Sequence, residues 1–110
     1  MLDPRDEVII EYIHNDTLHL EKSGSREVAV AINTITSAIA ENSKMSSAGR
    51  TKALALLKEI GNQVALPPQS RSVGVIRSVL GELTASMTAI RNLADVWSTW
   101  GPTIARFFSG

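Results

Sequence analysis

The amino-acid sequence predicts an all-α fold, in which a helical hairpin and a long C-terminal helix form a small bundle. Apolar residues recur through the last third of the chain at alternating steps of three and four, the spacing of a helix that packs along its length against other helices. This stripe consists of Val73, Ile76, Leu80, Leu83, Met87, Ile90, Ala94, Trp97, Gly101, Ile104 and Phe108. Only 5% of the residues are aromatic. The core must therefore be built mainly from aliphatic side chains, which suit close helix packing.

The length of 110 residues, with 44% hydrophobic and 20% charged, is enough for one globular domain with a modest core. We therefore expect a single domain over 1–110. It divides into an N-terminal segment (1–22), a helical hairpin (25–66) and a long helix (69–110). Gly101-Pro102 is expected to break the long helix, because proline interrupts helical hydrogen bonding.

Residues 4–22 are either a helix or a short β-hairpin. Asp3 and Pro4 make a good helix start, as N-cap and first helical residue. The stretch His14–Thr17 forms turns more readily than helices, and residues 18–21 alternate with the period of a strand. We favour the helix, because an isolated two-stranded hairpin is only marginally stable. The apolar residues that fit one helical face are Val8, Ile9, Tyr12 and Ile13.

Two amphipathic stretches predict the helical hairpin over 25–66. The first has its apolar positions at Val28, Ile32, Ile35 and Ile39, and the second at Ala53, Leu54, Leu57, Ile60 and Val64. Gly61 lies inside the second stretch, where a close neighbouring backbone would explain a residue that weakens a helix. Pro67-Pro68 ends the second helix, because neither residue can donate a backbone hydrogen bond.

The long helix is expected to begin near Ser70 or Ser72 and to reach about Trp100. At the usual helical rise its length is about 46 Å, whereas the two helices of the hairpin measure about 27 and 30 Å. The hairpin can therefore cover roughly two-thirds of the long helix. Either the N-terminal segment covers the rest, or the aromatic end over 96–108 stays bare.

The apolar stripe and this difference in helix length predict a non-enzymatic, adaptor-like interaction module that self-associates into a homo-oligomer through its C-terminal helix. The expected contact residues are Leu83, Met87, Ile90, Trp97, Trp100, Ile104, Phe107 and Phe108. Tryptophan and phenylalanine are also enriched where proteins meet membranes. The alternative is therefore a membrane-active protein, pore-forming or peripheral, that uses residues 83–108.

Nothing in the sequence predicts catalysis, a cofactor or a small-molecule substrate. The chain has no cysteine, and Gly49-Arg50-Thr51 lacks the second glycine and the lysine of a phosphate-binding loop. His14, Asp16 and His19, flanked by Glu11 and Glu21, form the one cluster with metal-binding residue types. A spacing of five places the two histidines on different faces of a helix. We therefore expect no metal site.

Charge is divided unevenly along a chain of zero net charge. Residues 1–43 hold eight acidic and three basic residues, a net charge of −5, and residues 44–110 hold three acidic and eight basic residues, a net charge of +5. The two halves are expected to pack on each other, or on a neighbouring copy, with complementary charge. Eight bases spread over 67 residues are too sparse for a nucleic-acid surface. No signal peptide is recognisable, and the lack of cysteine favours a cytoplasmic protein, with membrane association left open.

A helical hairpin followed by a long helix that ends in Trp100-Gly101-Pro102 resembles the small adaptor or effector-associated domains of bacteria. The resemblance implies an interaction role. It includes no motif that would assign a function to a particular residue.

Overall fold

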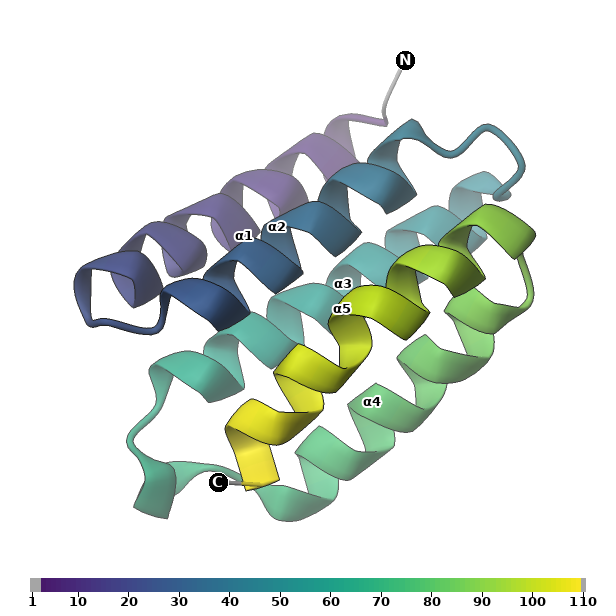
Figure 1. The fold of residues 1–110 in the computed structure, drawn as a ribbon. Helices are drawn as coiled ribbons and strands as arrows, with labels where there is room; N and C mark the ends of the chain where they lie inside the picture. Colours follow the sequence, from purple (N-terminus) through teal and green to yellow (C-terminus); the bar gives the residue numbers. More distant parts are fainter. Residues whose placement is uncertain (1–2, 110) are drawn as a thin grey trace.

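The structure, a computed structural model, describes residues 3–109. In this range the chain forms five α-helices and no strand (Figure 1). The helices are α1 (Pro4–Lys22), α2 (Arg26–Glu41), α3 (Ser47–Ala65), α4 (Val73–Thr88) and α5 (Arg91–Ser109), with a 3₁₀ turn, η1 (Pro68–Ser70), between α3 and α4. The all-α prediction is confirmed, and residues 4–22 are a helix and not a hairpin.

The helices form two layers around one core. Helices α1, α3 and α4 lie side by side in one layer, and α2 and α5 lie side by side in the other (Figure 1). Helix α2 also contacts α1 and α3, and α5 also contacts α4. Helices α1 and α4 therefore lie on opposite sides of the bundle. All five helices contribute large, fully buried side chains: Ile13, Ile32, Ile35, Ile39, Leu54, Leu57, Ile60, Leu83, Met87, Leu93 and Ile104.

Helix α1 continues through its turn-forming stretch because α2 supplies a polar partner there. Asp3 is the N-cap and accepts a hydrogen bond from the Arg5 amide at 2.8 Å. The buried Thr17 hydroxyl contacts the His14 carbonyl at 2.9 Å and Asn33 Oδ1 of α2 at 3.1 Å. A satisfied buried hydroxyl adds no desolvation penalty. The weak helix propensity of residues 14–17 is thus offset by packing.

Arg50 of α3 closes the end of α2. Its guanidinium donates hydrogen bonds to the carbonyls of Ile39, at 3.4 Å, and of Asn42. The Asn42 side chain in turn accepts from the amides of Lys44 and Met45, at 2.9 and 3.2 Å, and so shapes the connection to α3. The last carbonyls of a helix have no partner within the helix. Arg50 therefore provides hydrogen-bond donors for the carbonyls at the end of α2 and links α2 to α3.

The prediction of one long C-terminal helix is wrong. Helix α4 ends at Thr88, and after Ala89 and Ile90 the chain folds back as α5 (Figure 1). The hydroxyls of Thr84 and Thr88 donate to carbonyls four residues earlier, at 2.7 and 2.6 Å, an arrangement that bends and weakens helices. Folding back brings both halves of the apolar stripe onto the same core. The aromatic residues at the end of the chain are therefore packed against the core.

The predicted break at Gly101-Pro102 is also wrong, because α5 runs through it. Pro102 is exposed, so water can reach the Ser98 carbonyl that its missing amide leaves unpaired. Gly101 is buried, and a Cβ atom there would lie 3.0 Å from the Trp97 ring. Glycine at this position lets the indole lie against the helix backbone.

Candidate interaction surfaces

Three of the eight predicted contact residues lie in the core of the folded chain. Leu83, Met87 and Ile104 are fully buried, and they pack between the helices of both layers. Their side chains present no surface to a partner in this fold.

The other five predicted contacts, Ile90, Trp97, Trp100, Phe107 and Phe108, are partly buried against the same core. The Trp97 indole donates a hydrogen bond to Thr84 Oγ1 at 3.1 Å, which joins α5 to α4. Phe107 and Phe108 meet edge to face, with ring centroids 5.4 Å apart. The structure thus brings the aromatic residues together along one side of α5, and that side faces inward.

Arg71, which the sequence did not single out, joins the end of α3 to the end of α5. Its Nε donates to the Gln63 carbonyl and its Nη2 to the Val64 carbonyl, both at 3.0 Å. The same guanidinium lies 4.8 Å from the centroid of the Phe107 ring and 5.8 Å from that of Phe108. One side chain therefore caps a helix and holds the C-terminal aromatic pair by cation–π contact.

An open cleft of about 540 Å³, partly lined by Phe107, lies between the start of α2 and the end of α5. Arg26, Thr103 and Arg106 line it together with Glu27, whose charge offsets one of the arginines. All three charged side chains are exposed to solvent. The cleft is a polar surface groove rather than an enclosed pocket.

The candidate metal residues do not form a site. Among residues 3–109, no group of three or more histidine and carboxylate side chains is placed to hold a metal ion. His14 and His19 are exposed, whereas Asp16 is half-buried and faces α3. A Cβ atom on Gly61 would lie 3.1 Å from Asp16 Oδ2, so the close neighbour expected at this glycine is a side chain and not a backbone. Burial raises the pKa of Asp16, and the charges of Lys58 and His19 oppose that shift.

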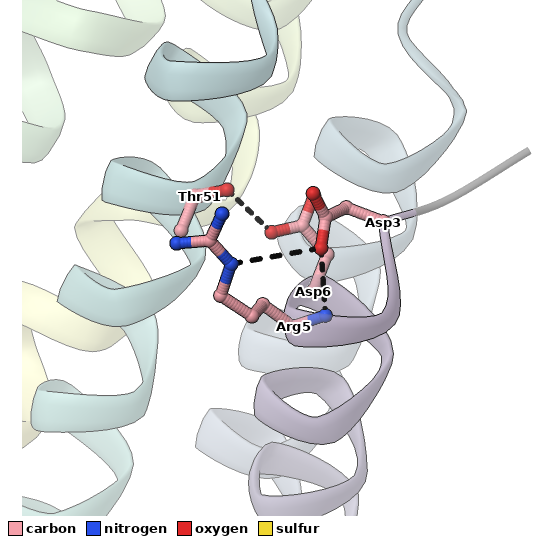
Figure 2. A network of polar contacts seen from close by, with 4 residues as sticks. All are labelled: Asp3, Arg5, Asp6 and Thr51. Carbon is pink, nitrogen blue, oxygen red and sulfur yellow. Dashed lines mark hydrogen bonds and ion pairs between the residues drawn. The ribbon is translucent and has the colours of Figure 1, made fainter.

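A second carboxylate of α1, Asp6, is fully buried near the first turn of the helix. Figure 2 shows it beside Asp3 and Arg5, with Thr51 reaching toward it from α3. Thr51 Oγ1 donates to Asp6 Oδ1 at 2.6 Å, and Arg5 Nε lies 3.8 Å from Asp3 Oδ1. Asp6 Oδ2 has no hydrogen-bond partner among the described residues. The N-terminal end of the helix dipole favours a negative charge there, and Thr51 ties α1 to α3.

The largest apolar side chains on the outside of the described chain include three from α1. Val8, Tyr12 and Leu18 are 53%, 54% and 55% exposed. Together with Glu11 and Asn15 they form what we call the α1 outer face. The apolar residues of α1 are thus divided, because Ile13 points to the core while Val8 and Tyr12 point outward. The expectation that Val8, Ile9, Tyr12 and Ile13 share one helical face is therefore wrong for Val8 and Tyr12.

Comparisons with models of protein families, with curated proteins and with solved structures find no match to this chain. None of the helices between residues 3 and 109 combines the length and the apolar character needed to cross a bilayer.

Proposed function

We propose that this protein is a non-enzymatic module that self-associates through the α1 outer face. The class of function is the one expected from the sequence, and the contact surface moves from the C-terminal helix to α1. The solvent exposure of the apolar side chains supports this change of contact surface. Val8, Tyr12 and Leu18 are each more than half exposed, while the aromatic residues of α5 are packed inward.

The available apolar area sets the strength of the association. Covering a half-exposed valine, leucine or tyrosine contributes about 1 kcal/mol, so the three together contribute about 3 kcal/mol. Association also costs several kcal/mol of translational and rotational freedom. We therefore expect a weak, concentration-dependent assembly rather than a permanent dimer.

Light scattering over a wide range of protein concentration tests the proposal. The molar mass of the wild-type chain is expected to rise with concentration, and Leu18→Glu is expected to remain monomeric. Ser98→Glu is the matched control, because Ser98 is equally a solvent-exposed helical position but lies on α5. A wild-type chain that stays monomeric throughout, or a Leu18→Glu variant that assembles like wild type, would contradict the proposal.

A membrane-active function for residues 83–108 is the second candidate, supported by the gathering of Trp97, Trp100, Phe107 and Phe108 on one side of α5. It requires α5 to leave the bundle, which would also expose the core residues Leu93 and Ile104. Trp97 and Trp100 are the only two tryptophans of the chain. A blue shift of their emission on adding anionic vesicles would support this candidate, and unchanged emission would contradict it.

A further inference from the structure

We propose that the α1 outer face of one copy docks on the outward side of α4 in a second copy, so that copies associate head to tail. This inference rests on the self-association proposed above and adds the surface that receives α1.

Within residues 3–109, the other large apolar side chains that are exposed lie at or just before the start of α4. Leu66, Val73 and Val75 are 37%, 68% and 38% exposed, and they lie at the end of α3 and the start of α4. Helices α1 and α4 are on opposite sides of the bundle (Figure 1). One copy can therefore offer both surfaces at once, each to a different neighbour.

Charge favours α4 over a second α1 as the receiving surface. Helix α1 holds five acidic and two basic residues, a net charge of −3, and exposed Glu7 and Glu11 lie beside its apolar side chains. Two α1 outer faces packed together would bring like net charge into contact, which is unfavourable, and the Lys58 amine 4.8 Å from the Tyr12 ring centroid offsets only part of that charge. Helix α4 holds two charged residues, Arg77 and Glu82. Glu82 is paired with Lys52 at 3.9 Å, whereas Arg77 has no ion pair within residues 3–109. Arg77 is available to the acids of an incoming α1.

Shape agrees with this pairing. The side of α4 that faces away from the core carries Gly74, Ser78, Gly81 and Ala85, all exposed. A Cβ atom added at Gly74 or at Gly81 would meet nothing within 4 Å. The backbone of α4 is thus open to close approach, while Tyr12 and Leu18 project from α1. Bulky side chains of one helix can fit over the small residues of the other.

The two surfaces differ, so the contact is heterologous. Each copy uses its α1 outer face once and its α4 side once, and the assembly closes into a ring or grows as an open filament. A two-fold dimer, in which both copies use the same surface, is not expected.

Mixing two blocked variants tests the inference. Leu18→Glu removes the α1 contact and Gly81→Arg obstructs the α4 contact, while Gly81→Ala serves as the matched control. Each blocked variant alone is expected to be monomeric, and Gly81→Ala is expected to assemble like wild type. An equimolar mixture of the two blocked variants is expected to form dimers of one copy each and nothing larger. Thermal melting of every variant checks that it is folded.

The outcomes separate this inference from the proposed function. If Leu18→Glu is monomeric and Gly81→Arg assembles like wild type, α1 is a contact surface and α4 is not its receptor. A mixture that stays monomeric also overturns the head-to-tail arrangement. If the wild-type chain never assembles, both proposals fail.

Disulfide trapping gives a second measurement that does not depend on Gly81→Arg folding. Because the chain has no cysteine, the variants Asn15→Cys and Ser78→Cys each carry a single thiol. Oxidation of their mixture is expected to yield the mixed disulfide in excess over either homodimer. A predominant disulfide between two Asn15→Cys chains would instead indicate a two-fold contact and overturn the inference.

Discussion

Two helical glycines have opposite surroundings and therefore predict opposite effects of alanine. Gly81→Ala is expected to stabilise the monomer by roughly 0.5–1 kcal/mol, because its Cβ is unobstructed and alanine is the better helix former. Gly101→Ala is expected to destabilise it by about 1 kcal/mol, because overpacking against the Trp97 ring costs more than the propensity gain. Urea unfolding at low protein concentration measures both. Stabilisation by Gly101→Ala would show that the indole does not lie against this backbone.

Asp16 makes the stability of the protein depend on pH. Its pKa in the folded chain is raised above the ordinary 3.8, mainly by burial, so the folded state holds its proton more tightly than the unfolded state does. The contribution of this carboxyl to stability is fully present below pH 3.8 and is lost as the pH rises through the folded pKa. Asp16→Asn, which resembles the protonated acid, is expected to be more stable than wild type at neutral pH.

Thermal melting of Asp16→Asn and wild type along a pH series measures this difference. The gap between the two melting temperatures is expected to close as the pH falls below 3.8. Glu21→Gln, at an exposed position on the same helix outside the α1 outer face, is the control for removing a carboxylate, and the Asp16→Asn gap at neutral pH should exceed its gap. A gap that widens at low pH would contradict the assigned sign.

At the scale of the helices, Arg71 predicts that the ends of α3 and α5 are stabilised together. Arg71→Ala removes two hydrogen bonds to the carbonyls of Gln63 and Val64 and the contact with Phe107. We expect a loss of about 2 kcal/mol in the free energy of unfolding. Hydrogen exchange should accelerate at the end of α3 and in the last turns of α5. Faster exchange confined to α3 would show that the aromatic contact contributes nothing.

The sequence predicted those helices well whose ends carry local signals. Asp3 before Pro4 and the pair Pro67-Pro68 mark the start of α1 and the end of α3, and the structure follows both closely. The turn at Ala89-Ile90 carries no glycine, proline or asparagine, and the apolar stripe continues through it in register. The turn forms because it allows both halves of the apolar stripe to be buried in one core. Pro102 shows the reverse case, a local signal for a helix end that the structure does not follow. A helix tolerates proline where the proline lies on the solvent-exposed side.

The proposed contact surface could not be predicted from the sequence for a related reason. The apolar stripe correctly marked Leu83, Met87 and Ile104 as residues that need cover, and the fold covers them within one chain. Which apolar residues remain outside depends on the direction in which each helix faces. That direction is a property of the whole bundle, and it leaves Val8, Tyr12 and Leu18 exposed.

For the molecule as a whole, the acidic N-terminal half and the basic C-terminal half of the chain bear both on packing within the bundle and on the proposed contact between copies. Within the bundle, Lys58 of α3 lies 4.8 Å from the centroid of the Tyr12 ring and opposes the raised pKa of Asp16, so basic α3 packs against acidic α1. Between copies, the acids of α1 are proposed to approach Arg77 of α4. Since exposed charge pairs are screened by salt, the assembly is expected to weaken as ionic strength rises. Arg77→Glu should weaken it further at low salt.

We propose that α1 and α4, and not the aromatic end of α5, form the contact surfaces. Backbone amide NMR spectra recorded at low and high protein concentration distinguish these surfaces. Concentration-dependent shifts are expected on the α1 outer face and on the outward side of α4, around Ser78 and Gly81. Shifts centred on Trp97, Trp100 and Phe107, or spectra that do not change with concentration, would contradict it.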